Sequence, residues 1–368
     1  MKIICHKSAL QKGVNIVSKA VSNKTTMPIL ECILIRAQHG VITMTANDME
    51  LGIETIIEGS IEEEGILALE AKLLSELVRR LPDNQVTITS DDKYTTVITC
   101  EKARFNLPGR SGDDFAYLPS VESGSQLTIS QFTLKEIIRQ TIFSIDENAS
   151  NKQMAGELME VKNDELRVVS LDGHRISIRK IQLKESFPPV RVTVPGKTLS
   201  DVSKILSGDA EAEVTLSFTH NHVVFQFDNT VVVSRLVDGQ YFKIDQMLNS
   251  DHETEIIVNK KELLNCIDRA TLLIKESDKK PIIMNVTDCS MEVKLKSSMG
   301  SMDEEIAIEK NGKDIMIGFN PKFLIDALRV IDDEMVHLYM INAKAPCYIR
   351  DEEQSYIYLI LPVTFSAM

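Results

Sequence analysis

The feature that most constrains this chain is an internal repeat of about 125 residues. Three helix-like segments end on an apolar residue, in steps of 125 residues, at Leu81, Leu206 and Ile331. Three strand-like segments end in steps of 124 and 125 residues, at Asp48, Asp172 and Ser297. A period of this length corresponds to a whole domain, because solenoid repeats span only about 20–50 residues. The sequence therefore predicts three copies of one domain.

Each copy contains two amphipathic helices and several short strands. Apolar residues recur every three or four positions in six predicted helices, at 8–22, 71–81, 133–144, 198–206, 260–273 and 321–331. Strand-like runs include 29–36, 41–45, 86–107, 214–216, 223–227, 282–286, 291–295, 336–340 and 355–361. This order predicts an α+β fold with domains at 1–125, 126–249 and 250–368. The alternative is a chance likeness among ordinary amphipathic elements.

Composition disfavours several classes of protein. No apolar run approaches the roughly 20 residues that a membrane helix needs. The start of the chain becomes polar too soon for a signal peptide. The six cysteines are scattered, without a C-x-x-C pair. We therefore expect buried free thiols in the cytoplasm, with neither a disulfide framework nor a zinc site.

The charge of the chain is unevenly distributed. The net charge of −13 argues against nucleic acid only if the charge is evenly spread. Several predicted helices carry a basic outer face, formed by Lys12, Lys19, Lys72, Arg79, Arg80, Lys135, Arg139, Lys197, Lys204, Lys322 and Arg329. A basic helical surface on an acidic body can hold duplex phosphates without reading bases. For one helix a solvated face is the simpler explanation, but the pattern recurs in every repeat.

Other modes of nucleic-acid binding are disfavoured. The chain has no Trp, 7 Tyr and 12 Phe, so a single-strand channel built on base stacking is not expected. No recognition-helix or zinc-finger pattern is present, which disfavours sequence-specific reading. The nucleic-acid partner expected from these residues is a duplex, bound through its phosphates without sequence specificity.

The segment 170–179, in the middle of the chain, predicts a strand, a tight polar turn and a second strand. Asp172 and His174 in this turn could form an acid–base pair. Alternatively, the turn could present its backbone and an apolar rim to a partner. The repeat places Asp172 at the position that Asp48 occupies in the first copy, which makes a structural turn the simpler interpretation.

The sequence lacks the additional residues that catalysis or cofactor binding would need. Gly196, Lys197 and Thr198 resemble the end of a phosphate loop, but that pattern requires a glycine where Arg191 stands. His220 and His222 flank an asparagine in a predicted hairpin turn, which is a weak basis for a metal site. No nucleophile elbow or Cys–His arrangement is present. We therefore predict no catalytic residue, no metal and no cofactor.

Several motifs resemble those of the bacterial sliding clamp, the beta subunit of DNA polymerase III. The resemblance covers essentially the whole chain, and its specificity comes from the order of the motifs together with the threefold repeat. The motifs lie at 27–30, 46–50, 69–74, 109–115, 172–175, 236–239 and 361–363.

The resemblance implies a ring of two chains joined head to tail. Six similar domains would surround duplex DNA, with helices lining the hole and strands outside. The ring would tether a replicative polymerase to DNA by topology. Lys24 matches a DNA-contacting basic position of the family, and the apolar contacts of the ring seam match Phe105, Leu107, Leu272 and Leu273.

The resemblance also implies an apolar cleft for short peptides of the polymerase, the clamp loader and repair polymerases. The positions that match the cleft are Met154, Leu171, Gly173, His174, Arg175, Ile176, Phe242, Gln246, Met247, Lys344, Pro346, Leu359, Ile360, Leu361, Pro362, Val363, Thr364 and Phe365. Phe242 stands where many relatives have proline, and Gln246 and Thr364 replace basic residues found in some. Residues 366–368 extend past the usual end of the family.

The leading hypothesis is thus a non-enzymatic DNA clamp. A metal-assisted hydrolase would use Asp48, Asp172 and His174, but the repeat places the two aspartates in different domains. A monomeric protein-binding scaffold that never meets DNA is the third hypothesis.

Overall fold

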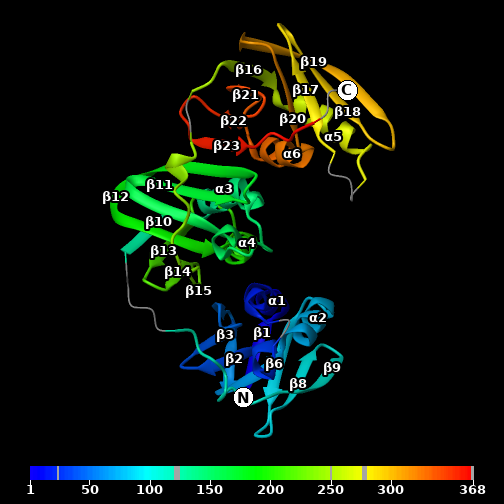
Figure 1. Cartoon of the computed structure of the whole chain (residues 1–368). Coiled ribbons are helices and arrows are strands. Elements are labelled where there is room, and N and C mark those ends of the chain that lie inside the picture. The colour runs from blue at the N-terminus through cyan, green and yellow to red at the C-terminus, as the bar shows by residue number, and fades with distance from the viewer. Residues whose placement is uncertain (23–24, 120–124, 249–250, 276–279, 366–368) are drawn as a thin grey trace. The chain divides into compact units, whose positions relative to one another are not determined.

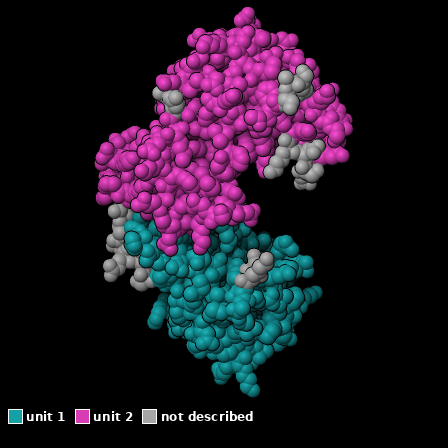
Figure 2. Space-filling model, in the orientation of Figure 1, with its two compact units in different colours: residues 1–135, 197–236 teal, residues 136–196, 237–368 magenta. Residues whose placement is uncertain are grey.

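The protein is described by a computed structural model, which covers residues 1–22, 25–119, 125–248, 251–275 and 280–365. These residues form two compact units (Figure 2). Unit 1 combines residues 1–135 with 197–236, and unit 2 combines residues 136–196 with 237–368. The predicted domain boundary at 125/126 falls at the start of strand β10 (Ser125–Ser130), whereas the boundary at 249/250 falls on residues outside the described ranges.

Unit 1 contains two antiparallel sheets. The first has the order β5-β1-β7-β8-β9, with β1 (Lys2–His6), β5 (Ser60–Glu63), β7 (Gln85–Ser90), β8 (Thr95–Cys100) and β9 (Ala103–Pro108). The second has the order β10-β13-β14-β15-β4-β3-β2-β6, with β2 (Cys32–Gln38), β3 (Val41–Asn47), β4 (Leu51–Ile57), β6 (Gly65–Glu70), β10 (Ser125–Ser130), β13 (Glu213–Phe218), β14 (His222–Phe227) and β15 (Thr230–Arg235). Because β4 pairs with β15, strands of the first and second repeats share this sheet.

Unit 2 contains one ten-stranded sheet with the order β11-β12-β23-β22-β21-β16-β19-β18-β17-β20 (Figure 1). Its strands are β11 (Gly156–Leu171), β12 (Arg175–Pro195), β16 (Thr254–Asn259), β17 (Ile282–Val286), β18 (Ser290–Lys296), β19 (Ser301–Gly312), β20 (Ile315–Phe319), β21 (Met335–Met340), β22 (Cys347–Arg350) and β23 (Tyr356–Ile360). The pairing of β12 with β23 joins the second repeat to the third.

The described residues form six α-helices: α1 (Lys7–Val17), α2 (Ala71–Arg80), α3 (Gln131–Thr141), α4 (Gly196–Ile205), α5 (Lys260–Thr271) and α6 (Pro321–Val330). Helices α2, α4 and α6 have ten residues each and begin 125 residues apart, at 71, 196 and 321. The repeat predicted from the sequence is therefore present in the secondary structure.

The helices form where apolar spacing and end groups agree. In α2, Leu74, Leu77 and Val78 are buried, whereas Arg79 and Arg80 are exposed. This division is the amphipathic pattern of a helix that covers a core. Side-chain caps begin the two helices of the third repeat: Asn259 accepts a hydrogen bond from the Lys261 N–H (3.0 Å), and Asn320 accepts one from the Lys322 N–H (3.1 Å).

The first predicted strand begins later than expected. Residues Pro28–Glu31 form a 3₁₀ turn, and strand β2 starts only at Cys32. Pro28 is the first residue of this turn, where its fixed φ near −65° matches the 3₁₀ conformation. The first helix also changes character before its predicted end, since Ser18–Ala20 form a 3₁₀ turn after α1.

Candidate peptide-binding pocket and nucleic-acid interface

The turn between β11 and β12 is built by Asp172. Its Oδ1 accepts hydrogen bonds from the backbone N–H groups of His174 (2.9 Å) and Arg175 (3.1 Å). Gly173 has φ +86°, a left-handed conformation that glycine adopts without strain. The carboxylate of Asp172 therefore shapes the backbone of the turn.

The same turn recurs in the other two repeats. Asp48 follows β3 and accepts from the Leu51 N–H (2.7 Å), and Ser297 follows β18 and accepts from the Met299 N–H (3.0 Å). The interpretation of 170–179 as a strand–turn–strand with counterparts in each repeat is confirmed.

Arg175 is held inside unit 2 by several partners. Its Nε donates to Asp172 Oδ2 (2.9 Å), its Nη1 donates to Asp326 Oδ2 on α6 (2.7 Å), and its Nη2 donates to the Phe143 carbonyl. The guanidinium also lies 4.6 Å from the ring centre of Phe323 on α6. The side chain is 7% exposed. Its charge thus ties the turn to α6, although the residue also contributes to the pocket described next.

Unit 2 contains a mainly apolar pocket of about 240 Å³ beside this turn. It is lined by Met154, Leu171, Gly173, His174, Arg175, Ile176, Phe242, Met247, Pro346, Leu359 and Leu361. All eleven belong to the set that the sequence assigns to the cleft. The other members of that set, Gln246, Lys344, Ile360, Pro362, Val363, Thr364 and Phe365, are not among the lining residues. Binding of a peptide in this pocket stays a prediction.

The pocket floor comes from three neighbouring strands. Ile176 on β12 pairs with Leu171 on β11 and with Leu359 on β23. These three residues belong to one buried apolar cluster with Tyr241 and Ile244, which lie in the connection after β15. Large apolar side chains that converge on a preformed hollow are typical of a site for an apolar anchor.

The C-terminal segment is anchored at two points in unit 2. The Leu361 N–H donates to the His174 carbonyl (2.8 Å), and the Val363 N–H donates to the Gly318 carbonyl on β20 (2.8 Å). A Cβ at Gly318 would lie 2.6 Å from the ring of Phe365, so this close approach requires glycine. The segment therefore lies against β20 as well as beside the pocket. Residues 366–368 lie outside the described part of the chain.

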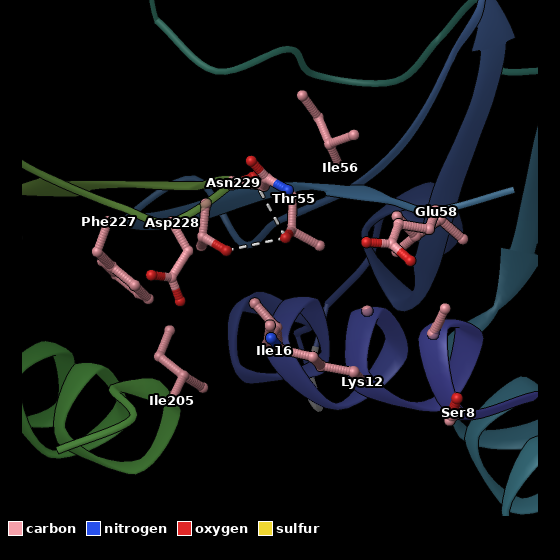
Figure 3. Close-up of a pocket in the computed structure, with 14 residues that line it drawn as sticks. Ser8, Lys12, Ile16, Thr55, Ile56, Glu58, Ile205, Phe227, Asp228 and Asn229 are labelled. Atoms are coloured by element: carbon pink, nitrogen blue, oxygen red, sulfur yellow. Dashed lines mark hydrogen bonds between the residues drawn. The ribbon is translucent and has the colours of Figure 1, made fainter. Parts of the chain in front are cut away.

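A second pocket, of about 300 Å³, lies in unit 1 (Figure 3). Residues of α1, β4 and the β14–β15 turn line it together with Ile205 of α4. Thr55 Oγ1 and Thr230 Oγ1 hydrogen-bond at 2.8 Å where β4 meets β15. Lys12, one of the basic residues singled out in the sequence, belongs to this lining.

The predicted basic residues lie on α-helices, apart from Lys19, which lies in the 3₁₀ turn Ser18–Ala20, and Lys24, which is outside the described ranges. Eight of them are exposed: Lys12, Lys72, Arg79, Arg80, Lys197, Lys204, Lys322 and Arg329; Lys19, Lys135 and Arg139 are half-buried. Several pair with acids: Lys197 with Asp48, Lys204 with Asp201, Arg329 with Asp268, and Arg139 with Glu136 and Asp332. Such pairs leave part of the basic surface neutralised within the chain.

The predicted seam residues present exposed apolar surface. Phe105 is 39% exposed on β9, an edge strand of the five-stranded sheet. Leu272 follows α5 and is 74% exposed, and Leu107 and Leu273 are half-buried. An edge strand with an exposed aromatic residue is a ready site for pairing with another chain.

The residues proposed for hydrolysis have structural partners. Asp172 is engaged with the turn and Arg175, and Asp48 Oδ2 accepts from Lys197 Nζ (3.2 Å). Within the described ranges, no group of three or more His, Cys, Asp or Glu side chains is placed to hold a metal. No helix in that part of the chain has the length and apolar character needed to cross a bilayer.

These features define a class of protein: a scaffold of three repeated α+β domains with basic helices and an apolar pocket. Family models of the DNA polymerase III beta subunit match the chain at 1–119 (N-terminal domain), 128–243 (central domain) and 245–364 (C-terminal domain). The beta sliding clamp of Bacillus subtilis (strain 168) is 35% identical, and the match covers 99% of each chain.

Solved structures agree with the sequence relatives. A putative DNA polymerase III beta subunit from Eubacterium rectale has a TM-score of 0.96 at 64% identity, covering 99% of this chain and 100% of that one. The Bacillus subtilis sliding clamp has a TM-score of 0.95 at 34% identity, with full coverage of both chains. The chain belongs to the DNA polymerase III beta subunit family, the sliding clamps of bacterial DNA replication. The predicted fold class and function are confirmed, and the hydrolase hypothesis receives no support.

Proposed function

We propose that two copies of this chain close head to tail around duplex DNA and form a ring of six domains. Domain boundaries at 125/126 and 249/250 divide each chain into three. The match of three clamp-domain models along the whole chain carries the proposal. Exposed Phe105 and Leu272 support a seam between β9 of one chain and the end of α5 of the other.

The helices line the hole of this ring and hold DNA loosely. Phosphate contacts carry no sequence information, so a basic lining permits sliding. The ion pairs of Lys197, Lys204 and Arg329 weaken the attraction further, because each cation already has an acidic neighbour. Lys24 is proposed to add a contact on the same surface. The protein is a cytoplasmic, non-catalytic tether.

The pocket beside Gly173 binds short peptides of the replicative polymerase, the clamp loader and repair polymerases. Its apolar lining supports the insertion of large apolar anchors. Met154 and Met247 suit several partners, since methionine repacks easily around different side chains.

Retention on circular DNA tests the clamp function directly. After loading on a nicked circle, the protein is expected to stay bound in high salt and to leave when the circle is cut. Equal rates of loss from circular and linear DNA would contradict the proposal and favour a monomeric scaffold. The solution mass gives an independent check, because a six-domain ring requires a dimer.

A further inference from the structure

One wall of the pocket is a connecting segment with no strand of its own. Residues 242–247 follow β15, and the pocket is lined by Phe242 and Met247 from this segment. A 3₁₀ turn, Ile244–Gln246, occupies its middle. Such a wall keeps its position only through its contacts with the strands below.

Arg167 on β11 makes a short polar contact to this segment. Its Nη1 donates to Asp245 Oδ1 at 2.7 Å. The Arg167 side chain is 10% exposed, whereas the Asp245 side chain is 72% exposed. Among the described residues, Nε and Nη2 of Arg167 have no hydrogen-bond partner. Asp245 is therefore the main hydrogen-bond acceptor for this buried guanidinium. The hydrogen bond from Arg167 in turn lowers the pKa of Asp245.

Glu160 ties a second arginine to the same place. Its carboxylate, 4% exposed, lies 3.6 Å from Arg167 Nη1 and pairs with Arg191 on β12. Arg191 Nη2 also donates to the Phe242 carbonyl (3.4 Å). Both ends of the 242–245 stretch are thus connected to one buried carboxylate.

Contacts with the sheet and its buried cluster hold the segment from below. Ile244 and Tyr241 are buried in the cluster under the pocket, and Tyr348 Oη donates to the Met247 carbonyl (3.4 Å). These contacts explain why the segment follows the sheet. The exposed side of the segment is held instead by a charged cluster formed by Glu160, Arg167, Arg191 and Asp245.

We propose that this charged cluster fixes residues 242–247 as a wall of the pocket and thereby sets how long a bound peptide stays. Its members are positioning residues, because none of the four lines the pocket. The inference rests on the proposed peptide-binding function of the pocket and adds the device that keeps the pocket formed.

The test is a double-mutant cycle on the full-length protein. The variants are Asp245→Asn, Arg167→Gln and their combination. The probe is a fluorescein-labelled peptide with large apolar anchors, taken from the replicative polymerase that this clamp serves. Fluorescence anisotropy gives the affinity and the dissociation rate, and amide hydrogen exchange reports on 242–247. Asp288→Asn is the matched control, since Asp288 is also exposed and pairs with a buried cation, Lys310, at 3.4 Å.

We expect Asp245→Asn to weaken the peptide about fivefold, through faster dissociation. Exchange at 242–247 should rise while the thermal midpoint changes little, and Asp245→Glu should restore the affinity. The double variant should bind no more weakly than Arg167→Gln.

Two results would overturn the inference. The first is unchanged affinity in Asp245→Asn while the wild type binds the peptide. The second is that Asp245→Asn lowers the peptide affinity as much in the Arg167→Gln background as in the wild type. That result would indicate that Asp245 contacts the peptide directly. Absence of binding by the wild type would instead contradict the proposed function. Asp245 is exposed, so its variant tests the inference even if Arg167→Gln fails to fold.

Discussion

Arg175 connects three parts of unit 2 through one buried guanidinium. Its substitution by alanine would leave Asp172 and Asp326 without their cation, at side-chain exposures of 12% and 20%. We expect Arg175→Ala to lower the free energy of unfolding by about 3–5 kcal/mol, because removal of one partner of a buried pair leaves the other charge buried and unpaired. Urea unfolding measures this change.

Arg235→Ala is a control for that experiment. Arg235 is 56% exposed and lies 3.8 Å from Glu50. Exposed pairs of this kind contribute at most about 1 kcal/mol. Similar losses in the two variants would show that Arg175 has no special structural role.

Glu157 on β11 gives unit 2 a dependence on pH. The side chain is fully buried, and this burial raises its pKa to about 8. The folded protein therefore keeps a proton that the unfolded chain loses near pH 4.5. The stabilising contribution is complete below pH 4.5 and is lost as the pH rises through 8.

We expect Glu157→Gln to remove this loss of stability at higher pH. Urea midpoints of the wild type should fall more steeply than those of the variant between pH 4.5 and about 8, where Glu157 is ionised in the unfolded chain and protonated in the folded protein. Glu185→Gln, at an exposed position of β12, should follow the wild type. Parallel curves for the wild type and Glu157→Gln would show that Glu157 is already ionised in the folded protein.

At the scale of elements, the C-terminal segment is joined to the pocket and to β20. Truncation after Ile360 keeps β23 but removes Leu361 and the contact of Phe365 with Gly318. We expect the truncated protein to lose peptide binding and to remain dimeric, because the proposed seam involves other residues. Anisotropy and solution mass provide the two measurements.

Truncation after Phe365 is the control for the segment. It removes only residues 366–368, and we expect peptide binding to be kept. If truncation after Ile360 left the peptide affinity intact, the C-terminal segment would have no part in the pocket.

The helices were predictable to within a few residues because apolar residues recur with a helical period along almost the whole of each helix. Helix α2 begins and ends almost where its pattern predicts. Strands were less predictable: β11 and β12 extend over 16 and 21 residues, and short-range patterns do not reveal such lengths. The contact of Arg175 with Asp326 spans 151 residues, and no local pattern in the sequence could indicate it.

The residues of the site also divide into those that the sequence could predict and those that it could not. The pocket residues followed from a family resemblance, residue by residue. Arg167 and Glu160 lie among the buried residues of a strand, where nothing in the local sequence marks them as partners of Asp245. Such roles depend on tertiary contacts, which only the folded chain contains.

At the scale of the whole molecule, assembly is expected to depend on a few exposed apolar residues. Leu272→Glu places a charge in the proposed seam, and burying it unpaired is costly. We expect the solution mass to fall by half and retention on circular DNA to disappear, with the fold unchanged by circular dichroism. Met335→Glu is the control, because Met335 is 41% exposed and is not part of the proposed seam. A dimeric Leu272→Glu protein would contradict this seam.

The pairing of β4 with β15 also has a mechanical consequence. Thr230 to Ser234 lie in register with Thr55 to Leu51, so backbone hydrogen bonds join the first two repeats. A ladder of this kind breaks cooperatively, since several hydrogen bonds share an applied load. A pull along these strands should therefore meet a high resistance that fails abruptly, whereas a seam of side chains can yield gradually.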